Sequence, residues 1–114
     1  MIGQSLAAVR NLFDDLPADL PKELFSPLIQ GKTFRVERIV SQGHASLLGF
    51  WYDQEENEWV IVLEGHARVE IEGICETIEL RRGSYINVPA HTKHRVIWTD
   101  SREKTVWLAI HYRE

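Results

Sequence analysis

From residue 33 to residue 112 the chain is a series of short apolar runs divided by turn residues, and this pattern restricts the fold more than any other feature. The runs are rich in β-branched and aromatic residues, which is typical of strands. In residues 66–71, for example, Ala67, Val69 and Ile71 alternate with polar residues, a period of two that turns one face inward. We expect strands over residues 33–40, 47–54, 59–63, 66–71, 74–80, 85–88, 95–98 and 105–112. This set predicts an all-β sandwich or barrel.

The first 32 residues have a different character. Pro17, Pro21 and Pro27 keep any regular structure short, and Pro21 suits the first turn of a short helix. The segment also carries too many leucines and phenylalanines for a disordered tail. We therefore expect residues 1–32 to form a helical brace that packs on a β domain, residues 33–114.

Length, charge and cysteine content exclude several classes of protein. A chain of 114 residues suits one core, and a net charge of -4 gives no basic surface for nucleic acid. Cys75 is the single cysteine, so neither an internal disulfide nor a zinc site with paired thiolates can form. No apolar run approaches the roughly 20 residues of a membrane span. We expect a cytoplasmic protein with neither nucleic acid nor membrane as a partner.

Two stretches, Tyr52–Gly65 and Gly83–His94, combine buried strands with chemically active side chains. Glu58 begins an apolar run, where a carboxylate is costly to bury unless it is paired or bound to a cation. His91 and His94 follow a Pro-Ala turn. A carboxylate and imidazoles at strand ends are typical of a metal site or an acid/base site.

The first of these stretches resembles the first motif of the cupin family, Gly-x5-His-x-His-x3(or 4)-Glu-x6-Gly. The motif glutamate falls on Glu58 and its last glycine on Gly65. Tyr52 and Gln54 stand where the motif has its two histidines. Half of the usual metal ligands of the family are therefore changed.

The second stretch resembles the second cupin motif, Gly-x5-Pro-x-Gly-x2-His-x3-Asn. Gly83, Pro89 and His94 match it, whereas His91 stands in place of the middle glycine and Trp98 in place of the asparagine. The resemblance covers roughly residues 33 to 112. It implies a double-stranded β-helix, the jelly-roll barrel of cupins, with the motif residues facing one cavity.

The resemblance puts Gln54, Glu58 and His94 at ligand positions of the family. His91, on a turn three residues before His94, could reach the cavity as a replacement ligand. These four residues would hold a divalent metal ion, namely iron, manganese, nickel or zinc. Glu58 and Tyr52 are the candidate catalytic residues, and the phenol of Tyr52 would act as an acid or base if its pKa fell from about 10. His111 shares a strand face with Trp107, which would place it on the cavity wall.

Three functions remain open at this point. The first is a metal-binding cupin that acts on a small molecule, as a dioxygenase-like enzyme or as an isomerase or lyase. The second is a non-enzymatic cupin that has lost its metal and binds a small ligand or serves in assembly. The third is metal-free acid/base catalysis on a sugar derivative by Tyr52, Glu58 and His94. The family resemblance implies a homodimer in each case.

Overall fold

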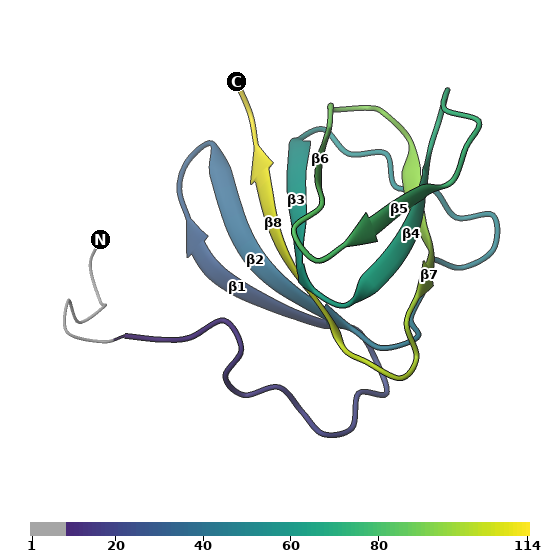
Figure 1. The fold of residues 1–114 in the computed structure, drawn as a ribbon. Coiled ribbons are helices and arrows are strands. Elements are labelled where there is room, and N and C mark those ends of the chain that lie inside the picture. The colour runs from purple at the N-terminus through teal and green to yellow at the C-terminus, as the bar shows by residue number, and fades with distance from the viewer. Residues whose placement is uncertain (1–8) are drawn as a thin grey trace.

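A computed structural model describes residues 9–114, in which every regular element is a β-strand (Figure 1). Five strands form one antiparallel sheet in the order β1-β2-β8-β3-β6, and three form a second in the order β5-β4-β7. The strands are β1 (Leu24–Gln30), β2 (Phe34–Ser41), β3 (Asn57–Glu64), β4 (His66–Ile71), β5 (Ile78–Arg81), β6 (Tyr85–Val88), β7 (His94–Thr99) and β8 (Thr105–Tyr112). The predicted all-β fold is confirmed.

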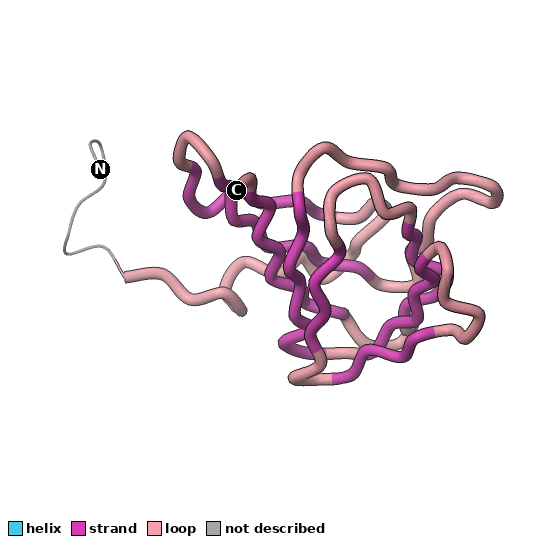
Figure 2. Tube along the Cα trace, turned by 90° about the horizontal axis from the view of Figure 1, so that it is seen from above, coloured by secondary structure: helices cyan, strands magenta, loops and turns pink. Residues whose placement is uncertain are grey.

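The two sheets face each other across a shared core (Figure 2). Strand alternation supplies that core, because Val60 and Val62 of β3 and Ala67 and Val69 of β4 all point inward. Trp107 of β8 adds the largest buried ring. The central strand β8 pairs with β2 on one side and β3 on the other, so its inward side chains lie at the middle of the molecule.

The predicted N-terminal helix is wrong over the described residues. Instead of a helix beginning at Pro21, the chain forms the edge strand β1, which pairs with β2. Pro27 has no backbone N–H to donate, which disfavours a helix interior or a central strand but is tolerated in an edge strand. The register between β1 and β2 shifts just after Pro27. Residues 1–8 of the predicted brace lie outside the described part of the chain.

A short segment before β1 does pack against the body of the protein. Arg38, on the outer face of β2, is only 8% exposed. Its guanidinium donates hydrogen bonds to the backbone oxygens of Leu12 and Asp14, at 3.0 and 2.7 Å. A buried cation thus holds residues 12–14 against the sheet, because each carbonyl accepts a charge-assisted bond.

The strand predicted over residues 47–54 is also wrong, since this segment is a loop with an isolated bridge between Tyr52 and His94. Gly49 has a φ of +82°, and the backbone of Phe50 donates to the oxygen of Leu47, so the chain turns where a strand would continue. Leu48 at the tip is fully exposed. The loop folds over one end of the barrel.

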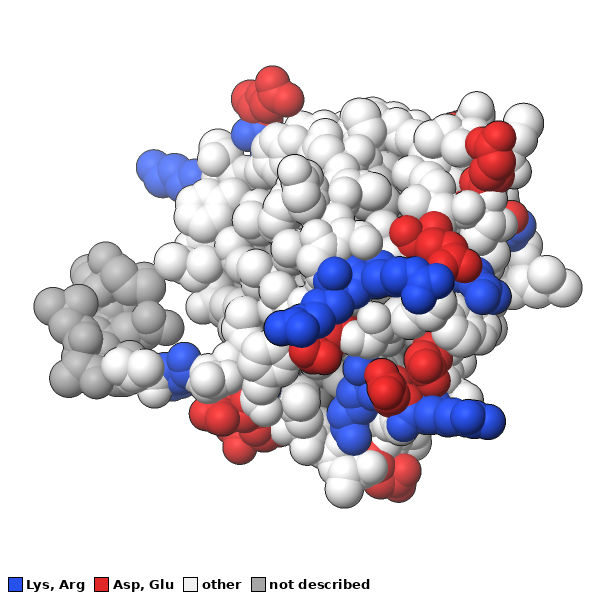
Figure 3. Space-filling view, in the orientation of Figure 1, with Lys and Arg blue, Asp and Glu red and all other residues white. Residues whose placement is uncertain are grey.

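The surface shows no segregation of charge on the face seen in Figure 3, where acidic and basic side chains lie beside one another. On the three-stranded sheet, Glu79 accepts hydrogen bonds from Arg68 and Arg81 and contacts His66. Residues 9–114 contain no helix that could cross a membrane.

Candidate functional site

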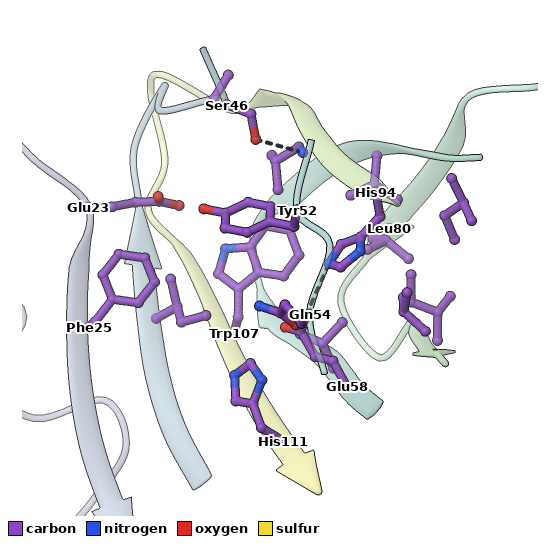
Figure 4. A pocket seen from close by; sticks show the side chains of 18 of the residues that line it. Glu23, Phe25, Ser46, Tyr52, Gln54, Glu58, Leu80, His94, Trp107 and His111 are labelled. Atoms are coloured by element: carbon purple, nitrogen blue, oxygen red, sulfur yellow. Dashed lines mark hydrogen bonds and ion pairs between the residues drawn. The ribbon is translucent and has the colours of Figure 1, made fainter. Parts of the chain in front are cut away.

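A cavity of about 330 Å³ lies between the two sheets and opens beneath the loop before β3 (Figure 4). Its walls are mostly apolar, and this volume is within the range of small-molecule sites. Polar side chains enter it from both sheets and from the loop. They are Glu23, Glu37, Ser46, Tyr52, Gln54, Glu58, His94 and His111.

Glu58 and His94 meet in this cavity, as the sequence predicts. Glu58 is near the start of β3 and His94 begins β7, so the contact joins the two sheets. Oε1 of Glu58 lies 3.2 Å from Nε2 of His94, and the two side chains are 13% and 15% exposed. The bridge between Tyr52 and His94, with backbone hydrogen bonds in both directions, fixes the start of β7.

The partners of His94 assign its protons. Nδ1 lies 3.0 Å from the backbone oxygen of Thr92, and Nε2 faces Glu58. A carbonyl and an ionised carboxylate can only accept, so this pair of contacts favours the imidazolium form, in which both ring nitrogens donate. Burial lowers the pKa of His94, but the hydrogen bonds to Glu58 and Thr92 and the charge of Glu58 outweigh it, so the pKa lies above its usual value.

Tyr52 covers the ring of His94. The two rings are stacked, with centroids 5.6 Å apart and planes inclined by 26°. Burial raises the pKa of Tyr52, and the charges of Glu23, Glu58 and Glu37 raise it further. The phenol therefore stays protonated at neutral pH. The lowered pKa that a catalytic base would need is not found, and Tyr52 is instead a hydrogen-bond donor.

A second carboxylate–histidine pair, between Glu37 and His111, was only half expected. The sequence placed His111 on the cavity wall but gave Glu37 no role, although Glu37 shares the inward face of β2 with Ile39. Nε2 of His111 lies 3.0 Å from Oε1 of Glu37. The hydrogen bond from His111 lowers the pKa of Glu37, burial opposes this shift, and the charges of His111 and Arg35 add to it.

Gln54 lines the cavity as predicted, and Glu23 does so unexpectedly. The amide oxygen of Gln54 is buried and has no hydrogen-bond partner within residues 9–114. Glu23 precedes β1, in the segment predicted to be a helix, where no pattern in the sequence marks it as a cavity residue. Its carboxylate accepts a hydrogen bond from Ser41 at 2.5 Å.

His91 lies outside the cavity, which corrects the predicted set of four metal ligands. Its backbone has a φ of +61°, the conformation that the glycine of the resembled motif adopts readily. The side chain points to solvent, is 68% exposed, and contacts Asp53 at 3.3 Å. Because His91 stands at a turn position with a left-handed backbone, its imidazole is directed away from His94.

The remaining donors fit a metal ion only in part. No group of three His, Cys, Asp or Glu side chains in residues 9–114 is arranged to hold one. Catalytic metal sites usually have three protein ligands. A metal bound by Glu58 and His94 would therefore need the unpartnered amide oxygen of Gln54 as its third protein ligand.

Comparison with protein families and solved structures adds independent evidence. The family model described as "Cupin domain" matches residues 39–111. The search of the curated proteins gives no match. A structure from Ralstonia eutropha JMP134, named as a putative mannose-6-phosphate isomerase, is 48% identical with a TM-score of 0.90. The alignment covers 94% of this chain and 99% of that one.

More distant structures share the fold alone. A cupin superfamily protein from Desulfitobacterium hafniense is 17% identical, with a TM-score of 0.70 over 87% of this chain and 84% of that one. An RmlC-like cupin with a double-stranded β-helix from Methanocaldococcus jannaschii is 15% identical, with a TM-score of 0.65 over 86% of each chain.

Proposed function

The chain belongs to the cupin domain family, and from that premise we propose that its cavity binds a small molecule and that Glu58 and His94 transfer a proton to or from it. The observation that carries the proposal is the environment of His94. Its ring lies between Glu58 and the backbone oxygen of Thr92, two groups that favour its protonated form, inside a cavity of ligand size. A buried acid beside a buried carboxylate is the arrangement that general acid/base catalysis requires.

The name of the Ralstonia structure supports this class of reaction. An aldose–ketose isomerisation moves one proton between neighbouring carbon atoms and another between their oxygen atoms, through an enediol. In this chain Glu58 would accept the proton from the carbon that bears the hydroxyl while His94 donates a proton to the carbonyl oxygen, which gives the enediol. Glu58 would then return its proton to the former carbonyl carbon as His94 accepts the proton of the other hydroxyl. Tyr52 would hold the carbonyl oxygen by a hydrogen bond. The described lining of the cavity has no Lys or Arg, and His94 is already paired with Glu58, so the lining has no free cation for a phosphate group.

Hydrogen exchange tests the proposal. Protein in D2O is incubated with small hydroxyketones and aldoses, and deuterium entering a carbon-bound position is followed by NMR. We expect exchange with the wild type and a loss of about a hundredfold or more in Glu58→Gln, since general acid/base catalysis contributes about that much. Glu76→Gln, on an exposed turn, is the matched control. Exchange in Glu58→Gln at the wild-type rate would overturn the proposal.

A second candidate function is supported by the unpartnered oxygen of Gln54. A histidine that donates Nδ1–H to a backbone oxygen, as His94 does to Thr92, is also the usual orientation of a metal ligand. Gln54, Glu58 and His94 would then hold a divalent ion that polarises a carbonyl oxygen when bound. Elemental analysis after loading with iron, manganese, nickel and zinc decides. Stoichiometric metal that is lost in both Glu58→Ala and His94→Ala supports this candidate, and protein that retains none ends it.

The homodimer and the cytoplasmic location remain proposals. In support of a dimer, the edge strand β1 exposes Phe25, Leu28 and Ile29 by 38–50%, and apolar edges of this kind mark many interfaces. Sedimentation of the full chain at increasing concentration tests the dimer. A monomer at all concentrations would contradict it.

A further inference from the structure

Two polar atoms in the cavity lack a hydrogen-bond partner. Gln54 Oε1 and His111 Nδ1 are both buried, and neither has a partner in residues 9–114. Buried polar groups are nearly always hydrogen-bonded. The amide oxygen of Gln54 can only accept, so it indicates that a donor from a ligand belongs here. Nδ1 of the buried His111 offers a second polar contact for the same ligand.

Carboxylates also dominate the charge of the lining. Glu23, Glu37 and Glu58 face the cavity, whereas its described lining contains no Lys or Arg. Glu58 is matched by the imidazolium of His94, and Glu37 lies 3.6 Å from Nη1 of Arg35, which is outside the lining. Glu23 forms no ion pair with any described residue. Its negative charge is the one that no protein cation in residues 9–114 offsets.

Glu23 is held in a fixed position by a relay of hydrogen bonds. Nε1 of the buried Trp107 donates to Oγ of Ser41 at 3.1 Å, and Ser41 in turn donates to Oε2 of Glu23. The other oxygen, Oε1, accepts no hydrogen bond from the described chain. A carboxylate anchored through one oxygen presents the other to the cavity at little cost in side-chain entropy.

Two aromatic side chains lie near this carboxylate. Phe25 lies beside Glu23, and the hydroxyl of Tyr52 points toward the carboxylate (Figure 4). Phe50, which also lines the cavity, packs edge-on against Tyr52 with centroids 4.9 Å apart. A carboxylate beside apolar rings suits an organic cation, because the carboxylate attracts the charge and the rings bury the hydrocarbon.

We propose that the ligand of this cavity is a small organic cation, an ammonium compound with an apolar body. The positive nitrogen lies beside Glu23, the body lies against the apolar walls, and a further donor meets Gln54. The inference rests on the proposed function and assigns a ligand class to the same cavity. A phosphate or carboxylate ligand would meet three carboxylates, while the described lining has no Lys or Arg and His94 is already paired with Glu58.

Binding of matched probes tests this assignment. The titrants for calorimetry are 2-phenylethylamine, 2-phenylethanol and phenylacetate, which share a ring and differ in charge. Mannose is added as a neutral probe without an apolar body. We expect the amine to bind about tenfold or more tightly than the alcohol, as a hydrogen-bonded charge does, and phenylacetate to bind least. Glu23→Gln keeps the hydrogen bond from Ser41 but removes the charge, so it should reduce the amine to the affinity of the alcohol. Glu76→Gln should leave the ratio unchanged.

The outcomes separate this inference from the proposed function. If the alcohol binds as tightly as the amine, if phenylacetate binds best, or if Glu23→Gln leaves the amine affinity unchanged, the cationic ligand is wrong while the small-molecule cavity stands. If mannose binds and no phenyl compound does, the same conclusion holds. If no probe binds, the ligand class is overturned, and the exchange experiment on Glu58→Gln still judges the proton transfer separately.

Discussion

The two carboxylate–histidine pairs of the cavity have the same chemistry in different surroundings. Glu58–His94 joins the two sheets, and both nitrogens of its ring have acceptors. Glu37–His111 lies within one sheet, between β2 and β8, and Nδ1 of its ring has no partner in the described chain. The first pair holds both nitrogens of its ring, and the second leaves Nδ1 of its ring available to a ligand. The two pairs therefore differ in the partner of Nδ1 and not in the carboxylate.

The largest effect that separates the pairs should be on stability. His111→Ala removes a buried ring and the hydrogen bond that it donates to Glu37, which keeps only its contact with Arg35. We expect the free energy of unfolding to fall by about 3 kcal/mol, from the cavity created and the lost hydrogen bond together. Urea denaturation measures it. His91→Ala, which removes an exposed ring, should change stability by no more than about 0.5 kcal/mol. Equal losses in the two variants would contradict the buried role of His111.

The next effect is the pH dependence of stability conferred by His94. Its pKa is raised in the folded protein, so the pair stabilises the fold fully below the unfolded value of about 6.5. That contribution is lost as pH rises through the folded pKa. The difference in unfolding free energy between wild type and Glu58→Gln should be about 1 kcal/mol at pH 6 and shrink toward pH 9. A difference that grows with pH would reverse the assigned sign.

Glu37 should show the opposite dependence on pH. The hydrogen bond from His111 lowers its pKa, so its contribution is present above the unfolded value, near 4.5, and is lost as pH falls through the folded pKa. Comparing wild type with Glu37→Gln by urea denaturation should show about 1 kcal/mol at pH 6 and less at pH 3. A constant difference over this interval would mean that the pair is not ionic.

The smallest effect is expected from the hydroxyl of Tyr52. Stacking on His94 depends on the ring, so Tyr52→Phe should change the free energy of unfolding by no more than about 0.5 kcal/mol. Tyr52→Ala, which removes the ring as well, should cost about 2 kcal/mol for a half-buried aromatic side chain. If Tyr52→Phe lowers the free energy of unfolding as much as Tyr52→Ala does, the hydroxyl has a hydrogen-bond partner within the protein and is not available to a ligand.

The sequence predicted the first pair and only part of the second for a definable reason. Glu58 and His94 lie at fixed spacings in motifs, and strand alternation places Glu58 inward. Glu37 is one charged residue among several in β2, and its role depends on the register that sets β2 beside β8. Pairing between strands that are about 70 residues apart cannot be obtained from local pattern alone.

The errors in the fold and in the site have a common origin in backbone detail. Residues 47–54 have the composition of a strand, yet the turn at Gly49 makes them a loop. His91 has the chemistry of a ligand, yet its left-handed backbone directs the ring to solvent. Pro21 suits a helix start, yet pairing with β2 makes the following residues an edge strand. In each case the residue type suits the predicted role, but the backbone conformation or the strand pairing gives the residue a different one.

The protonation of His94 is the central claim, and ring 15N chemical shifts measure it directly. Through a pH titration, both nitrogens of His94 should keep their protons to a higher pH in the wild type and in Glu37→Gln than in Glu58→Gln, because the hydrogen bonds to Glu58 and Thr92 raise the pKa of His94. A His94 titration that Glu58→Gln leaves unchanged would contradict the account.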